Sequence, residues 1–451
     1  MPAAAPKSDA THAPDPEARL ERALGVRELA ATIFNYTVGS GIFALPAVAV
    51  AELGGAAPLA YVACALVMGC VVLCFAEAGS RVSLTGGPYA YVEVALGPFV
   101  GFIAGVMLFA TGLSAGAAVV VLFVDSVGAA SPLGAAWLRG TLIVAVVVGL
   151  AAINLRGVRR SAQAVEVLTV AKLVPLVLFV VAGAAFIHPQ NLAWRTTPPL
   201  KDVLGTAGIV IFAFSGIESA LTPSGEVRAP ARTVPRASFL ALGAATLLYL
   251  AIQWVALGIE GSALGRTGAT PLADAAGEFA GHGGRLLMIV GASVSMLGYL
   301  SGNMLAVPRS LFAFARDGFL PRVLAAVDPR FHVPHVAVVV YALAMAGLAL
   351  SGTFRELAVL SNLAAFVLYA LSAIGVWALR RRDVREAGVP FRIPGGPTVP
   401  LAACVLSLGL IFATAQRLEL IGLGAMAAVA ILLYAVRTVR TRRVSAASLE
   451  G

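Results

Sequence analysis

The stretch TVGSGIF (Thr37–Phe43) lies inside an apolar run that is long enough to cross a membrane. Two glycines around a serine are poor helix formers, so this stretch predicts a break in the helix. Inside a bilayer, non-helical backbone is tolerated only where it is buried in protein or lines a cavity. The stretch therefore predicts a spanning helix that is interrupted near its middle.

The composition of the whole chain is that of a membrane protein. Of its 451 residues, 59% are hydrophobic and 12% are charged, and the mean hydropathy is +0.90. A soluble protein of this length needs more charge to cover its surface. The net charge of +9 would favour nucleic-acid binding in a soluble domain, but here we interpret the arginines as membrane-topology signals and expect no nucleic-acid partner.

Apolar runs that could each cross a bilayer recur along almost the whole chain. Arginines gather in alternate connections, for example Arg228, Arg232 and Arg236, whereas the connection from Asp125 to Trp137 has none. By the positive-inside rule, this alternation predicts that both termini are cytoplasmic. The runs predict about twelve helices, near 28–50, 57–79, 98–125, 138–154, 162–187, 202–222, 235–259, 284–314, 335–351, 356–379, 400–416 and 419–438.

These spans predict one integral membrane domain over residues 28–438, in contact with lipid in the plasma (inner) membrane. Residues 1–27 are expected to form a disordered cytoplasmic tail, and residues 439–451 a cytoplasmic C-terminal tail. No metal or cofactor is expected, because the cysteines lie in apolar segments without metal-ligand spacing. They are Cys64, Cys70, Cys74 and Cys404.

A second Ser/Gly pair, Ser215-Gly216, interrupts the sixth run. It lies five spans after the first break, which predicts two inverted repeats over about 28–187 and 202–379, followed by two extra helices over 400–438. One such break is more often a helix-packing feature. Paired breaks at matching positions of inverted halves favour a transporter binding site.

The two breaks would offer backbone groups of opposite polarity. Amide N–H groups at the start of a half-helix suit a carboxylate, and carbonyls at the end of a half-helix suit an ammonium group. An α-amino acid carries both groups on one carbon, so it is the expected substrate. The candidate binding residues are Thr37, Gly39, Ser40, Gly41, Ile42, Phe212, Ala213, Phe214, Ser215 and Ile217.

Two ionisable residues fall inside apolar runs. Lys172 lies in the fifth run, where a lysine is costly and indicates function. The alternatives are that it reaches the interface or binds backbone carbonyls structurally. Glu218 follows the second break and has a gating or structural role in our interpretation. Phe212 either covers a bound ligand or is an ordinary core or lipid-facing aromatic.

Four motifs in order resemble the amino acid–polyamine–organocation superfamily of secondary transporters. They are GSGIFALP (Gly39–Pro46), the segment Ala76–Phe102, the segment Phe212–Ala237, and FARDGFLP (Phe314–Pro321). The resemblance covers the chain from about Arg27 to Tyr434. It implies the five-plus-five inverted-repeat (LeuT-like) fold, all-α, with the substrate between spans one, three, six, eight and ten.

The resemblance also implies roles for single residues. Gly39, Ser40 and Gly41 would meet the substrate carboxylate, the carbonyls of residues 212–215 would meet its amino group, and Phe212 would be a gating aromatic. Lys172 matches a lysine that takes the place of a sodium ion and ties the first helix to the eighth. On the eighth helix this chain has Asn303 where many relatives have serines, so Asn303 is a second coupling candidate.

The sequence thus favours a sodium-independent secondary transporter of neutral amino acids, driven by a proton or by exchange with a counter-substrate. A cationic amino acid or polyamine antiporter is the alternative, and it needs an acidic subsite, for which Glu93, Asp125 and Glu218 are candidates. A membrane enzyme or receptor is disfavoured. A receptor would need a soluble output domain, and the sequence predicts none. An enzyme would need a catalytic set, but the histidines are expected in the tail or in loops and form no such set. They are His12, His188, His282, His332 and His335.

Overall fold

The computed structural model describes residues 24–84, 86–129, 136–156, 172–194, 197–222, 224–331, 333–386 and 388–447. Within these ranges the chain is helical, and its one β-type pairing is an isolated parallel bridge between Leu24 and Val227. The α-helices are α1 (Val26–Thr37), α2 (Gly41–Leu53), α3 (Pro58–Arg81), α4 (Pro88–Leu96), α5 (Pro98–Ala129), α6 (Ala136–Leu155), α8 (Leu200–Val210), α9 (Ile217–Ala220), α10 (Pro230–Glu260), α11 (Pro271–Ala306), α12 (Pro308–Arg316), α13 (His335–Ser351), α14 (Phe354–Arg381), α15 (Thr398–Thr414) and α16 (Arg417–Ala447). An apolar helix also covers Lys172–Phe186.

The helices have the length and composition of membrane spans. Among the described residues, eight helices are long and apolar enough to cross a bilayer, and the bent pair α1–α2 is a ninth candidate. Three shorter apolar helices are Lys172–Phe186, α13 and α15. The prediction of an all-helical, multi-pass membrane protein is therefore confirmed.

The largest departures from the predicted spans are in three helices. α4 was not predicted, because its nine residues are too few for an apolar span. α11 begins at Pro271 rather than near 284; its first turns carry Asp274 and Glu278 and end in a kink at Gly281 (φ 59°), so the apolar pattern does not reveal them. α16 continues to Ala447, past the predicted end at 438. The predicted tail over 1–27 falls mostly on residues 1–23, which lie outside the described part of the chain.

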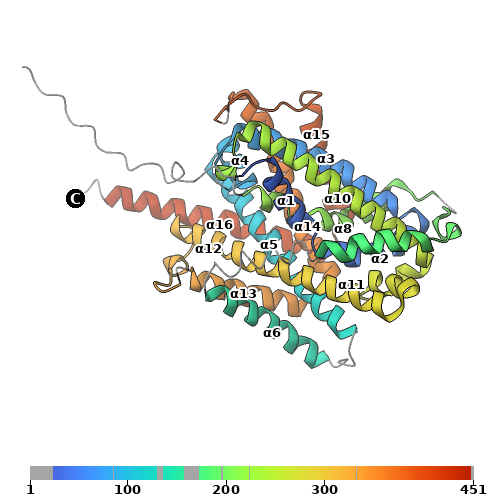
Figure 1. The fold of residues 1–451 in the computed structure, drawn as a ribbon. Helices are drawn as coiled ribbons and strands as arrows, with labels where there is room; N and C mark the ends of the chain where they lie inside the picture. Colours follow the sequence, from blue (N-terminus) through green and yellow to red (C-terminus); the bar gives the residue numbers. More distant parts are fainter. Residues whose placement is uncertain are drawn as a thin grey trace, which may run out of the picture.

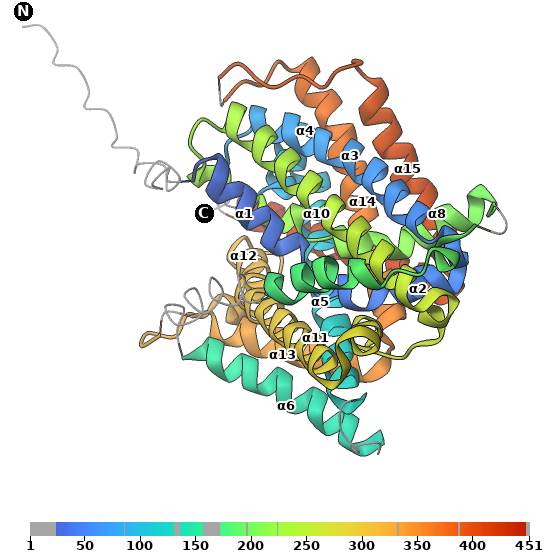
Figure 2. The same cartoon turned by 45° about the vertical axis from the view of Figure 1, so that its right-hand side comes forward.

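Burial separates core helices from peripheral ones. The most apolar windows of α5, the α8–α9 segment and α14 are 67%, 72% and 78% buried, whereas those of α6 and α16 are 28% and 6% buried. In Figures 1 and 2, α6 lies at the rim beside α13, and in Figure 1 α16 projects past the body toward the C-terminus. The second break is thus placed in the core, and α6 and α16 present most of their surface outward.

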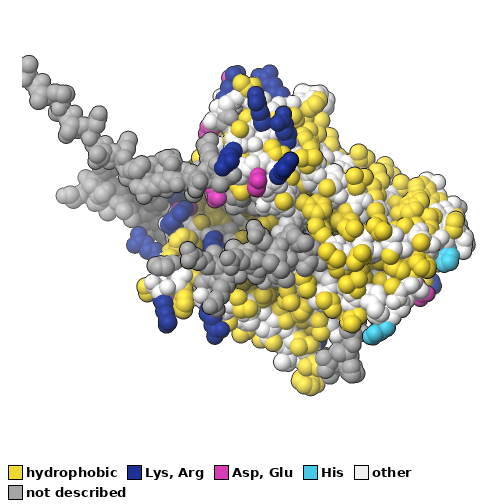
Figure 3. All heavy atoms as spheres, viewed as in Figure 1, with side chains coloured by type: hydrophobic (Ala, Val, Ile, Leu, Met, Phe, Trp, Pro, Cys, Tyr) yellow, Lys and Arg dark blue, Asp and Glu magenta, His cyan; other side chains and the backbone are white. Residues whose placement is uncertain are grey.

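Lys and Arg side chains are unevenly distributed over the face shown in Figure 3. On the face in Figure 3, Lys and Arg side chains gather toward the end from which α16 projects, while apolar atoms cover the middle and histidines mark the opposite end. A band of apolar surface between polar ends is the pattern of a membrane-embedded protein.

A buried carboxylate fastens the loop before α15 to the end of α3. Glu77 is fully buried and accepts hydrogen bonds from Arg81 Nη2 at 2.9 Å, Arg380 Nη2 at 2.6 Å and the Ile393 backbone N–H at 2.9 Å. Charge-assisted bonds of this kind are strong, and a buried charge without partners is costly. Arg380, which the sequence suggested only as a topology signal, therefore also has a packing role.

The entry to α1 is joined to the loop that follows α9. The Leu24 N–H donates to the Glu226 carbonyl at 3.0 Å, and the Arg228 N–H donates to the Leu24 carbonyl at 2.8 Å. These two bonds hold the segment before the first span against the segment after the second break.

Candidate functional site

The first predicted break is present between α1 and α2. α1 ends at Thr37, α2 begins at Gly41, and the two parts of the span are bent by 52°. The Gly39 N–H turns back to the Thr37 carbonyl at 2.8 Å. The Phe43 N–H donates to the Ser40 carbonyl at 3.1 Å, and since the first amides of a helix lack the usual partner one turn earlier, the start of α2 directs N–H groups toward the break.

The second break lies between α8 and α9. After Val210 the chain tightens into a 3₁₀ turn over Ile211–Phe214, and Ser215 is then extended (ψ 150°). Gly216 has φ 111°, a left-handed conformation that favours glycine. A Cβ atom at Gly216 would lie 2.6 Å from the Tyr36 carbonyl oxygen, so this glycine also lets the second break approach the end of α1.

The two breaks touch each other and share one hydrogen-bond donor. A Cβ atom at Gly41 would lie 3.0 Å from Ala213 Cα, which places backbone against backbone. The hydroxyl of Tyr249, on α10, lies 2.8 Å from both the Thr37 and the Ala213 carbonyl oxygens. Tyr249 was not predicted, because a tyrosine in an apolar helix looks like any core aromatic; its fully buried hydroxyl joins the two breaks.

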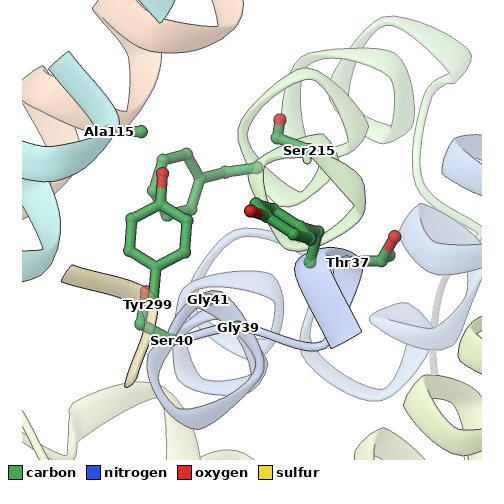
Figure 4. Close-up of a pocket in the computed structure, with 9 residues that line it drawn as sticks. Thr37, Gly39, Ser40, Gly41, Ala115, Ser215 and Tyr299 are labelled. Atoms are coloured by element: carbon green, nitrogen blue, oxygen red, sulfur yellow. The ribbon is translucent and has the colours of Figure 1, made fainter. Parts of the chain in front are cut away.

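A small cavity lies where the breaks meet (Figure 4). Six of the predicted binding residues line it, and Ile42, Ala213, Phe214 and Ile217 instead have their side chains in the core. Three further lining residues were not predicted, because Ala115 and the two tyrosines carry no break signal. The lining residues are Tyr36, Thr37, Gly39, Ser40, Gly41, Ala115, Phe212, Ser215 and Tyr299.

The polar groups of this cavity are backbone groups and hydroxyls. None of the nine lining residues has a charged side chain. The Thr37 hydroxyl donates to the Ile33 carbonyl at 2.8 Å, and its side chain points away from Tyr299 in Figure 4. The cavity therefore suits a small molecule whose own charges are satisfied by amides and carbonyls.

Glu218 and Asn362 form hydrogen bonds with the backbone on either side of the second break. The fully buried Glu218 carboxylate accepts the Gly216 N–H at 3.0 Å and the Tyr369 hydroxyl at 3.0 Å. The Asn362 side-chain amide, from α14, donates to the Gly208 carbonyl at 2.9 Å, where α8 gives way to the 3₁₀ turn. Both contacts lie at the unwound segment, which is compatible with the gating or structural role predicted for Glu218; Asn362 was not predicted.

Lys172 contacts the first half-helix. Its Nζ atom donates to the Asn35 carbonyl at 2.6 Å, and the residue is 5% exposed. Asn303, the other coupling candidate, lies among different partners: its Nδ2 atom donates to the Gly112 carbonyl at 2.9 Å, and its Oδ1 atom accepts the Tyr341 hydroxyl.

The chain is similar in sequence to known membrane transporters. The family model described as amino acid permease matches residues 24–436. The chain is 33% identical over 428 residues to an uncharacterized transporter of Mycobacterium tuberculosis, covering 94% of this chain and 93% of the relative. It is 28% identical to the methylthioribose transporter of Bacillus subtilis, covering 87% and 88% of the two chains.

A further relative is the branched-chain amino acid permease of Bacillus subtilis, which is 26% identical over 428 residues, 88% of each chain. The family match spans nearly the whole chain, including both breaks and Lys172. The chain therefore belongs to the amino acid permease family of the amino acid–polyamine–organocation superfamily.

Proposed function

We propose that this protein is a sodium-independent secondary transporter that carries neutral amino acids across the plasma (inner) membrane by proton-coupled symport or by exchange. The observation that carries this proposal is the meeting of two helix breaks at one cavity with no charged side chain in its lining. Membership of the permease family supports transport, and the branched-chain permease among its relatives supports a neutral substrate.

The proposed topology has twelve spans. The nine span candidates and the three shorter apolar helices supply them, and the 17 residues of α13 and of α15 reach the lower limit for crossing a bilayer. Repeats over about 28–187 and 202–379 each begin with a broken span, and both termini lie in the cytoplasm. The gathering of Lys and Arg at the α16 end supports this orientation (Figure 3).

In the proposed binding mode the backbone holds the part that all amino acids share. Amides at Ser40 and Gly41 bind the carboxylate beside Gly39, whose own N–H donates to the Thr37 carbonyl, and carbonyls of the segment 212–215 bind the ammonium group. The Phe212 ring gates the cavity; it is 7% exposed and packs edge-on against Phe354, with ring centroids 5.6 Å apart.

Lys172 is the proposed coupling charge. Its amine binds a carbonyl of α1 two residues before the break, so a change in its charge would act directly on the first half-helix. The protonated amine of Lys172 would stabilise backbone carbonyls of α1 by its positive charge, as a bound cation would in a cation-dependent transporter.

A cationic amino acid or polyamine needs an acidic group in the cavity. The described lining has none, and the carboxylate of Glu218 is already engaged by Gly216 and Tyr369. Neutral substrates are therefore favoured over the antiporter alternative.

Uptake by purified protein in liposomes tests the function. We expect accumulation of radiolabelled alanine or leucine when the outside is acidic or when unlabelled amino acid is inside, with no requirement for sodium. Excess arginine or putrescine should compete poorly. Absence of uptake under every gradient, or competition by arginine as strong as by alanine, would contradict the proposal.

Replacing Tyr249 with phenylalanine should weaken substrate binding about fivefold to tenfold. The change removes a hydroxyl that two buried carbonyls share, and such a loss costs roughly 1–1.5 kcal/mol. The matched control is Tyr61→Phe, because the Tyr61 hydroxyl is fully buried but has no hydrogen-bond partner among the residues that the structure describes. Equal affinity loss in both variants, measured by substrate-dependent thermal shift, would show that the bond to the breaks is not what matters.

A further inference from the structure

Two of the nine residues that line the cavity come from outside the two broken spans, Ala115 of α5 and Tyr299 of α11. In the proposed binding mode the two breaks hold the charged groups of the substrate, so its side chain faces these two residues. The Tyr299 ring also lies against the first break: a Cβ atom at Gly39 would be 3.9 Å from Tyr299 Cδ2. The position of Tyr299 relative to α5 therefore fixes the room available to the substrate's side chain.

Tyr299 is followed one helical turn later by Asn303, on the same face of α11. The Asn303 Nδ2 atom lies 3.5 Å from the Tyr299 hydroxyl and donates to the Gly112 carbonyl at 2.9 Å. Its Oδ1 atom accepts a hydrogen bond from the hydroxyl of Tyr341, a fully buried residue of α13. The oxygen of this hydroxyl also lies 3.3 Å from the Gly112 carbonyl oxygen. One amide thus joins Tyr299 to two other helices.

Glycines on α5 make this network possible. A Cβ atom at Gly116 would lie 2.8 Å from Asn303 Oδ1 and 3.0 Å from the Tyr341 hydroxyl. A Cβ atom at Gly112 would lie 2.7 Å from a methyl group of Val307. Ala115 sits between these two contact points, so the spacing of α5 and α11 beside the cavity is set by the Asn303 and Tyr341 side chains.

We propose that Asn303 and Tyr341 are positioning residues that limit the size of the amino acid side chain that the transporter accepts, by holding Tyr299 and α5 at a fixed separation. This inference rests on the proposed function for the identity of the substrate. Asn303 then acts on substrate selection through Tyr299, in place of the coupling role that the sequence suggested.

The first arm of the test measures selectivity by uptake in liposomes. Wild-type protein should take up alanine in preference to phenylalanine, and Asn303→Leu and Tyr341→Phe should shift this ratio toward phenylalanine by about tenfold, the discrimination that one methylene group typically gives. The matched control is Ser361→Ala: its buried hydroxyl donates to the carbonyl of Thr111, next to Gly112 on α5, at 3.0 Å, but belongs to α14. This control should keep the wild-type ratio.

The second arm measures the width of the cavity without any substrate. In an Ala115→Cys background, methyl methanethiosulfonate should label the new cysteine about tenfold faster than the benzyl reagent, and Tyr341→Phe or Asn303→Leu should reduce this difference. Protein without Ala115→Cys corrects for the native cysteines. Because this arm needs no transport, it decides the inference even if wild-type protein takes up no amino acid, which would count against the proposed function alone.

Two results would overturn the inference. One is an unchanged labelling ratio in both network variants. The other is a selectivity shift in Ser361→Ala as large as in Tyr341→Phe, since any lost bond to α5 would then have the same effect. Should Asn303→Leu fail to fold, Tyr341→Phe, which removes only one oxygen atom, carries both arms.

Discussion

Lys172→Ala abolishes proton-driven uptake, or uncouples it from the proton gradient, while the protein still reaches the membrane. The variant removes the amine that donates a hydrogen bond to the Asn35 carbonyl of α1, so that carbonyl loses this partner. A hydrogen bond to a charged group is worth roughly 1.5–3 kcal/mol, which corresponds to about tenfold to hundredfold in an equilibrium constant. The measurement is initial uptake into liposomes across a range of external pH.

Lys201→Ala is the matched control for this prediction. Lys201 is an exposed lysine in the first turn of α8, so its removal changes the net charge equally without touching α1. It should keep wild-type uptake and pH dependence. A Lys172→Ala protein with the same uptake and the same pH profile as wild type would remove Lys172 from the coupling mechanism.

Gly41→Val should weaken substrate binding by about 5–150-fold. The new Cβ atom would lie 3.0 Å from Ala213 Cα and 3.2 Å from Ala213 N, so the two breaks must move apart to admit it. Overpacking of this kind costs roughly 1–3 kcal/mol, or about 5–150-fold in affinity where the strain falls on the site. Thermal shift of the purified protein with alanine and leucine measures the loss, because a ligand of the folded state raises its apparent stability.

Gly243→Val separates this effect from the general cost of valine in a membrane helix. Gly243 lies in α10, and a Cβ atom there has no neighbour within 4 Å in the described part of the chain. The variant should bind substrate like wild type. Wild-type affinity in Gly41→Val would mean that Gly41 takes no part in the site.

The parts of the fold that depend on local chemistry could be predicted from the sequence. Ser/Gly pairs inside apolar runs located both breaks, because helix propensity and the cost of free backbone in lipid act residue by residue. Lys172 stood out for the same reason, as a charge in an apolar run. Of the predicted binding residues, Thr37, Gly39, Ser40, Gly41, Phe212 and Ser215 line the cavity.

The side-chain contacts that depend on which helices pack together could not be predicted from the sequence. Tyr249, Tyr299 and Asn362 lie in apolar helices without any local signal, and their roles follow only from the carbonyls and side chains brought beside them by other spans. Asn303 was noticed but was linked to Lys172, because a sequence does not tell which face of a helix meets which neighbour.

The pairing of Leu24 with the segment 226–228 has a mechanical consequence. If the cavity opens toward the end where α1 begins, α1 can swing outward alone only by breaking two backbone hydrogen bonds, a cost of roughly 1–3 kcal/mol. Motion that carries the loop after α9 along with α1 avoids that cost. The bridge therefore favours an opening motion in which α1 and the loop after α9 move together while the two breaks become exposed.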